Sequence, residues 1–399
     1  MTDFYTRLGV PRRINAAGTL TRLGGSLMES EVLQAMQEAA SASVDIAELQ
    51  VAASQVIASA TGAEAGIVTS GAAAGLTLAT AACLARWDVA RMAALPDTRA
   101  MPHRVLMART HRNSYDHAVR LAGAHIVDIG HNDRGTGAGV RGLEAWEIEA
   151  AIDAQTVAML FTATADTVDD LPLVLSTLHQ RGLPVIVDAA AQLPPRSNLR
   201  AFIAAGADLV VFSGGKAIGG PQASGILAGR RALVGSALVQ MMDMDVNPQT
   251  WSAASLIDRD ALNGIPHHGI GRGFKVGKEE IAGLVVALQR FVDRDEHAAA
   301  ALMAQRLQKI AALVGAGSLI QTHLVPHDPA HPIPLLELTV PGSAHDFSRR
   351  LQQGSPPVHL GERLAASGVL ILNPQTLHLD DDAVLVRCLI EACRSEKSQ

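Results

Sequence analysis

Residues 210–225 read VVFSGGKAIGGPQASG. The segment opens as an apolar strand that ends near Ser213, and two glycines then lead to Lys216. The chain has five lysines against 28 arginines, so a lysine at a buried strand end indicates a need for an amine rather than for a charge alone. Burial lowers the pKa of a lysine and makes it a nucleophile that can form a Schiff base, which arginine cannot do. The alternative is a lysine that only neutralises a buried carboxylate.

From about residue 50 to 240, short apolar runs alternate with amphipathic helical patterns. The runs are rich in Val, Ile and Leu, as expected of strands buried on both faces. This alternation predicts an α/β fold with a three-layer, mostly parallel sheet. The predicted strands are 65–69, 104–108, 125–130, 157–163, 185–190 and 209–214, and the clearest helices between them are 143–153, 171–182 and 199–206.

The C-terminal part of the chain has the pattern of a smaller α+β domain. A Gly-, Pro- and His-rich junction leads into a long helix over 279–313 with a break. We therefore predict an N-terminal segment (1–48), a large domain (49–270) and a small domain (271–399). Further elements are predicted at 335–340 (strand), 345–353 (helix), 369–372 and 375–379 (strands) and 381–394 (helix).

The composition excludes several classes of protein. A hydrophobic content of 48% with 18% charged residues excludes a disordered chain, and a net charge of −6 gives nucleic acid no basic surface. Three cysteines (Cys83, Cys388 and Cys393) form no disulfide framework. No HExxH or paired CxxC pattern occurs, so no metal site is predicted.

The sequence contains no recognisable signal peptide or membrane span. The first residues contain no apolar signal-peptide core. Residues 66–85 carry no charge but are rich in Gly, Ser, Thr and Ala, which fits a strand, a turn and a buried helix better than a membrane span. We expect a cytoplasmic protein without membrane or nucleic-acid partners.

An anion site is predicted where the first strand ends, in VTSGAAAG (68–75). Ser70, Gly71 and Ala72 lead into a helix, and the free amides of a helix start bind phosphate well. Small side chains allow a phosphate to approach the backbone closely. The alternative is that Ser70 is an ordinary helix N-cap.

Two other strand ends carry polar side chains. Asp188 ends the apolar run VIVD, where a carboxylate is costly unless a cation meets it; the alternative is a helix cap. His111 follows the strand at 104–108 and could lie over a flat ring, or could be an exposed loop residue.

An anion site, a buried carboxylate, a reactive lysine and a planar stacking group together describe a site for pyridoxal 5′-phosphate (PLP). Ligands of parallel sheets bind at the carboxyl ends of the strands, where all four lie. We assign the phosphate to Ser70–Ala72, the ring nitrogen to Asp188, the aldehyde to Lys216 and one ring face to His111. A non-catalytic PLP-binding protein remains the alternative, and the lack of GxGxxG argues against a nicotinamide enzyme.

Four motifs strengthen this interpretation: FSGGKAIGGPQASGILAG (212–229), INAAGTLTRLGGS (14–26), TGAEAGIVTSGAAAG (61–75) and GRGFKVGKEEIAGL (271–284). They resemble the selenocysteine synthase / D-glucosaminate-6-phosphate ammonia-lyase family of fold-type-I PLP enzymes over about residues 8–390. The resemblance implies an aspartate-aminotransferase-like fold and a homodimer or higher homo-oligomer. It also implies that the segment 1–48 packs on the small domain and the partner subunit. Ser213 is implied as a phosphate contact, and Thr164 or Asp166 as the group near the ring hydroxyl. The acidic balance argues against a role in charging tRNA.

The function predicted from these residues is a PLP-dependent lyase. It would act by α,β-elimination on a small β-hydroxy amino acid or amino sugar acid, with Lys216 as general base, giving a 2-oxo acid and ammonia. Arg272, Lys275 and His267 are candidates for binding the substrate, unless they form a solvated basic loop. An aminotransferase, a racemase, an aldolase or a β-replacement enzyme could use the same site.

Overall fold

The computed structural model describes residues 3–132 and 142–394, which form two compact units. The larger unit comprises residues 28–292, and the smaller unit combines residues 1–27 with 293–399. The division therefore groups residues 28–48 and 271–292 with the large sheet, whereas the sequence placed domain boundaries at 48 and 270.

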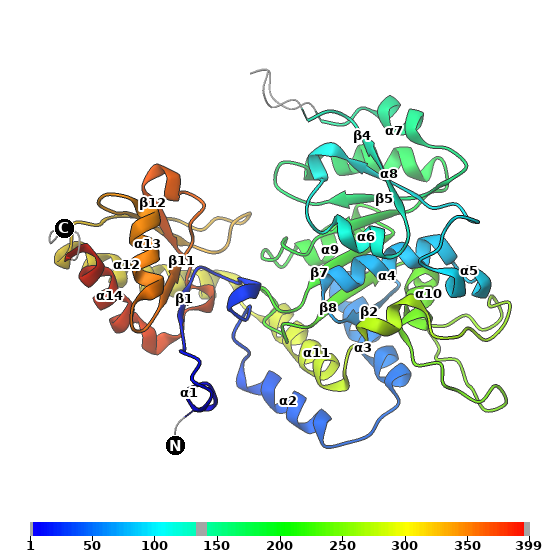
Figure 1. The fold of residues 1–399 in the computed structure, drawn as a ribbon, viewed down its shortest axis with the longest axis horizontal. Helices are drawn as coiled ribbons and strands as arrows, with labels where there is room; N and C mark the ends of the chain where they lie inside the picture. Colours follow the sequence, from blue (N-terminus) through cyan, green and yellow to red (C-terminus); the bar gives the residue numbers. More distant parts are fainter. Residues whose placement is uncertain (1–2, 133–141, 395–399) are drawn as a thin grey trace. The chain divides into compact units, whose positions relative to one another are not determined.

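The larger unit is built on a seven-stranded sheet in the order β2-β8-β7-β6-β5-β3-β4 (Figure 1). All neighbouring strands are parallel except β8, which runs antiparallel to both β2 and β7. The sheet confirms the predicted α/β fold. Its strands are β2 (Ala65–Thr69), β3 (Arg104–Ala108), β4 (His125–Ile129), β5 (Thr156–Thr162), β6 (Val185–Asp188), β7 (Leu209–Ser213) and β8 (Gly225–Gly229).

Helices flank this sheet and complete its core. Helix α4 packs on four of the central strands and is buried throughout its last three turns, which explains the uncharged stretch at 66–85. Gly75 makes this approach possible, because a Cβ there would lie 3.0 Å from Val211 Cγ1. The helices are α2 (Ser30–Ala40), α3 (Ile46–Thr61), α4 (Ala72–Ala85), α5 (Val89–Ala94), α6 (Asp116–Leu121), α7 (Ala145–Ala151), α8 (Leu171–His179), α9 (Asn198–Ala204), α10 (Arg231–Met241) and α11 (Lys278–Asp293).

The smaller unit contains a three-stranded antiparallel sheet, ordered β12-β10-β9, and a parallel pair formed by β1 and β11. The predicted break in the long helix is present, because the Asp295 side chain caps a new helix there by accepting from the Ala298 amide (3.0 Å). Its elements are α1 (Phe4–Arg7), β1 (Ile14–Ala16), α12 (Glu296–Gly317), β9 (Gln321–Val325), β10 (Leu335–Thr339), α13 (Ala344–Gln353), β11 (Val358–Leu360), β12 (Val369–Leu372) and α14 (Asp382–Arg394).

The sequence prediction differs from the structure at 375–379 and at strands β1, β8, β9 and β11, which it did not include. The strand predicted at 375–379 is wrong: Pro374–Thr376 and Leu379–Asp381 are 3₁₀ turns. The Asn373 side chain accepts from the Gln375 amide (2.9 Å) and so starts the first turn directly after β12. Strand β8 was not predicted, because its five residues follow a glycine-rich loop and begin and end with glycine. Within the described residues, no helix is both long and apolar enough to span a bilayer.

Candidate active site

The register of the sheet brings the predicted site residues to one edge. Thr162 is the partner of Asp188, and Ser213 is the partner of Gly225 across β7 and β8. Thr69 is the partner of the same Gly225 on its other side. Because β8 is antiparallel, it begins where β2 and β7 end, and only a glycine separates those two strand ends.

The segment after β2 forms a cradle of backbone amides. Gly71 precedes helix α4 with φ 132°, and among the described residues no side chain caps the first amides of the helix. Ser70 is not the N-cap; its Oγ donates instead to the Phe274 carbonyl (2.8 Å). Free amides at a helix start, with the positive end of its dipole, favour an anion. The ordinary N-cap alternative for Ser70 is therefore wrong.

Gly225 keeps this cradle open. A Cβ at this position would lie 2.6 Å from Gly71 C and 2.7 Å from Ala72 N, both backbone atoms. We expect Gly225→Ala to displace the start of α4 and to weaken PLP binding by about 10–100-fold, the loss of one charge-assisted hydrogen bond. Absorbance titration of the apoenzyme with PLP measures this. The control is Gly264→Ala, because a Cβ there meets nothing within 4 Å; equal affinities in the two variants would contradict the cradle.

Asp188 and Lys216 act on each other electrostatically. Asp188 is 8% exposed at the end of β6, and one carboxylate oxygen accepts from the Ala190 amide (3.0 Å). Burial raises the pKa of Asp188, opposed by this hydrogen bond and by the charge of Lys216. Burial lowers the pKa of Lys216, opposed by the charge of Asp188. A nearby cation therefore stabilises the buried carboxylate, and Lys216 loses its proton more readily than a solvent-exposed lysine.

The glycines around Lys216 are required by close packing. A Cβ on Gly214 would lie 2.2 Å from Ser224 Oγ, and one on Gly215 would lie 2.6 Å from Gln222 Cα. The Gly219 amide donates to the Lys216 carbonyl (2.9 Å) and closes the turn. The tightly packed segment Ser213–Gly215 thus fixes the position of Lys216 just after the end of β7.

His111 is buried rather than exposed in a loop. The residue is 2% exposed, its Nδ1 accepts from the Thr162 amide (3.4 Å), and its ring meets Phe161 edge to face at 4.6 Å. Burial lowers the pKa of His111 to about 4. The imidazole is therefore neutral near pH 7 with its proton on Nε2, and that buried atom has no hydrogen-bond partner among the described residues.

Sequence reasoning missed two residues beside His111. The Thr162 Oγ1 donates to the His111 carbonyl (3.2 Å), and Asn113 Nδ2 donates to the same carbonyl (3.1 Å). Thr162 ends β5 and lies opposite Asp188 at the end of β6. Its place at the end of a predicted strand is the signal in the sequence that could have identified it as a site residue. Thr164 instead contacts Thr167 (3.1 Å between hydroxyl oxygens), and Asp166 is exposed.

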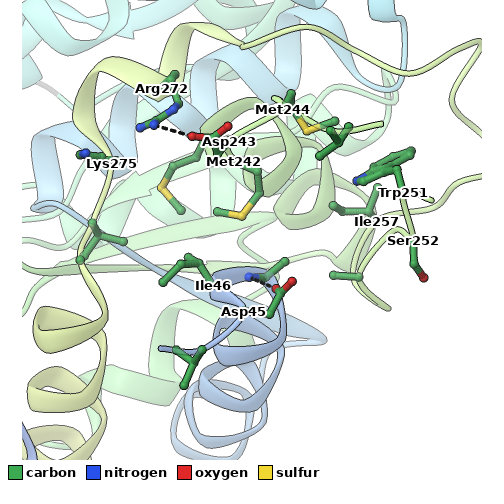
Figure 2. Close-up of a pocket in the computed structure, with 17 residues that line it drawn as sticks. Asp45, Ile46, Met242, Asp243, Met244, Trp251, Ser252, Ile257, Arg272 and Lys275 are labelled. Carbon is green, nitrogen blue, oxygen red and sulfur yellow. Dashed lines mark hydrogen bonds and ion pairs between the residues drawn. The ribbon is translucent and has the colours of Figure 1, made fainter. Parts of the chain in front are cut away.

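Arg272 and Lys275 lie elsewhere, on a cavity of about 540 Å³ (Figure 2). Its lining is largely apolar and includes Met241, Met242, Met244 and Trp251. Arg272 Nη2 donates to Asp243 Oδ2 (2.7 Å), as Figure 2 shows.

The residues proposed around Lys216 do not line this cavity. The link between the two places is Phe274, which lies between Arg272 and Lys275 and accepts the Ser70 hydrogen bond. His267 is exposed and does not line the cavity.

The residues at the sheet edge fit PLP. The uncapped amides of α4 suit a phosphate, the buried Asp188 suits a protonated ring nitrogen, and Lys216 suits an aldehyde. The unpartnered Nε2 of His111 shows that a polar group is missing from the described surroundings of that ring.

Comparisons with known proteins agree with this fit. The chain is 31% identical to D-glucosaminate-6-phosphate ammonia lyase of Salmonella typhimurium over 98% of this chain and 97% of that protein. It is 30% identical to 5′-C-glycyluridine monooxygenase-decarboxylase of a Streptomyces species over 97% of this chain and 91% of that protein. A solved structure of D-glucosaminate-6-phosphate ammonia-lyase has a TM-score of 0.82 and 29% identity, covering 99% of each chain.

The family comparison covers the larger unit. The model for aminotransferase class-V matches residues 28–292, the same range as the unit that carries the seven-stranded sheet. L-seryl-tRNA(Sec) selenium transferase of Geotalea daltonii is 25% identical over 53% of this chain and 46% of that protein, which confirms the second resemblance. The chain therefore belongs to the aminotransferase class-V family and has PLP as its cofactor.

Proposed function

We propose that this enzyme is an ammonia-lyase that acts by α,β-elimination on a small β-hydroxy amino acid or an amino sugar acid. The observation that carries the proposal is the full-length similarity to D-glucosaminate-6-phosphate ammonia lyase. The pair Lys216 and Asp188, whose charges act on each other at the sheet edge, supplies the chemistry. Loss of the β-hydroxyl as water, followed by hydrolysis, gives a 2-oxo acid and ammonia.

The chain's own residues perform distinct parts of this reaction. Bound PLP supplies an electron sink for negative charge at the carbon next to nitrogen. Lys216 Nζ, whose pKa burial lowers, takes the proton from the substrate's α-carbon. The Asp188 carboxylate keeps the ring nitrogen protonated. Ser70, Gly71 and Ala72 bind the phosphate through the uncapped start of α4, with Ser213 beside them.

His111 contributes a fixed hydrogen-bond donor. The Thr162 amide occupies Nδ1, so Nε2 carries the proton and cannot accept one near pH 7. The imidazole can therefore orient a group through Nε2–H but cannot replace Lys216 as the base. Its buried ring excludes water from this side of the site.

Arg272 and Lys275 are proposed to bind an anionic group of the substrate. If Arg272 contacts that anion, Arg272→Gln should raise KM by about 10–100-fold, while kcat changes much less. Steady-state kinetics measure this. Asp243→Asn is the matched control, because it removes only the carboxylate that pairs with Arg272. An equal rise in KM in both variants would mean that Arg272 merely holds Asp243.

The reaction can be tested with a panel of D- and L-β-hydroxy amino acids and amino sugar acids, D-glucosaminate 6-phosphate included. Elimination releases ammonia and a 2-oxo acid in equal amounts without an amino acceptor. Strict dependence on a 2-oxo acid acceptor would instead show transamination. Oxygen uptake and CO₂ release are followed in parallel, because the Streptomyces relative is a monooxygenase-decarboxylase.

The proposal extends to the setting of the enzyme. We propose a homodimer or higher homo-oligomer in the cytoplasm, in which the N-terminal segment packs on the small domain and the partner subunit. The substrate is a small molecule rather than a nucleic acid or a membrane lipid, since the chain carries a net charge of −6. The His267 side chain is proposed near the entrance for substrate.

A further inference from the structure

A group of basic side chains gathers in the smaller unit, away from the residues discussed so far. The parallel pairing of β1 with β11 places Asn15 opposite His359. This pairing brings Arg13, the residue before β1, to His359, with 3.4 Å between Arg13 Nη1 and His359 Nε2. The contact joins positions 346 residues apart in the sequence.

This contact fixes the protonation of the imidazole. A guanidinium can only donate, so His359 Nε2 accepts and the proton of the neutral ring lies on Nδ1. His359 is 4% exposed, and its Nδ1 is buried with no hydrogen-bond partner in the described part of the chain. A buried donor without an acceptor is unfavourable and indicates a missing water or ion.

The surroundings of this ring are positively charged. Burial lowers the pKa of His359, and the charges of Arg22 and Arg13 lower it further. Both arginines are exposed, and no ion pair joins either one to a carboxylate within the described residues. Glu362 is the acidic group that acts on the ring, and its Oε1 accepts from Ser348 Oγ (2.6 Å).

We propose that Arg13, Arg22 and His359 form a binding site for an oxyanion, a carboxylate or a phosphate. Arg13 lies against the imidazole of His359, and the charge of Arg22 acts on the same ring. A planar or tetrahedral oxyanion is the ligand that guanidinium groups bind best. The anion would neutralise the two arginine charges and accept the hydrogen bond from His359 Nδ1. The site lies entirely within the smaller unit and does not depend on the reaction catalysed.

Sulfate is the probe, and the PLP-loaded enzyme is used so that the cofactor site is already filled. Calorimetric titration gives the Kd for sulfate at constant ionic strength. We expect Arg13→Gln and Arg22→Gln each to weaken sulfate binding about tenfold or more, and the double variant to abolish it. Both side chains are exposed, so the variants should fold.

Arg12→Gln is the matched control, because Arg12 is also exposed and its charge acts on Asp3. It should bind sulfate as the wild type does. Sulfate affinities that are the same in all five proteins, or no sulfate binding in the wild type, would overturn the site. Comparison among variants removes the general stabilising effect of sulfate on proteins.

Steady-state kinetics then separate two sources of the anion. If the site takes the substrate's own carboxylate, sulfate inhibits competitively and Arg13→Gln raises KM. If it takes a free anion, sulfate binds without changing KM. Only this second step rests on the proposed function, so an inactive enzyme that still binds sulfate through Arg13 and Arg22 would refute the proposed function and support the site.

Discussion

Replacing Lys216 with alanine should abolish turnover, with a loss of at least about 10²–10⁴-fold from general-base catalysis alone. The reason is that Lys216 Nζ is the half-buried amine at the end of β7, with a pKa that burial lowers. Exchange of the substrate's α-proton in deuterated water, followed by NMR, should disappear along with the activity. Exchange at the wild-type rate in this variant would show that another group is the base.

Two further variants separate chemistry from charge. Lys216→Arg keeps the positive charge beside Asp188 but cannot lose its proton, so it should be as inactive as the alanine variant. Recovery of activity in Lys216→Arg would favour the view that Lys216 only neutralises Asp188. Lys278, which forms an ion pair with Glu279, is the control, and Lys278→Ala should keep its α-proton exchange.

Replacing Asp188 with asparagine should lower kcat by about 10²–10³-fold, because one partner of a buried charge pair is removed. Asparagine keeps the size of the side chain, so the fold should persist. The ring nitrogen of the cofactor would lose its proton more easily, and the absorbance of the bound cofactor should titrate at lower pH than in the wild type. Unchanged kcat and an unchanged titration would remove the assigned role.

The same variant has a second consequence in the apoenzyme. The charge of Asp188 raises the pKa of Lys216 against the effect of burial. Its removal should therefore lower the pKa of Lys216 further, and the lysine should react with an amine-directed label at lower pH. Asp166→Asn is the control, because Asp166 is exposed and should leave both kcat and the labelling profile unchanged.

The sequence predicted the parallel part of the fold well because its inner strands are buried on both faces, whereas β4 at the end of the sheet is partly exposed. An apolar run such as VIVD, which ends in a charge, marks both the strand and the place where the charge is needed. Strand β8 escaped prediction because GILAG is stabilised by pairing with β2 and β7 rather than by its own pattern. The turns at 374–381 escaped prediction because side-chain caps outweigh the strand propensity there.

The sequence did not predict those features of the site that depend on packing between residues far apart in the chain. Whether His111 is buried depends on Phe161 and Thr162, about fifty positions away, and no local pattern reveals that contact. Likewise, no sequence pattern near Arg13 predicts its contact with His359, which lies 346 positions away. The strand ends at Asp188 and Ser213 were predictable because local hydrophobicity alone places them at the edge of the sheet.

The central claim is that Lys216 holds PLP covalently through its Nζ. The most direct measurement is borohydride reduction of the holoenzyme, which fixes that bond, followed by proteolysis and mass spectrometry. The account predicts one pyridoxyl-modified peptide, with the added mass on Lys216. An unmodified Lys216, or the adduct on another lysine such as Lys275, would contradict it.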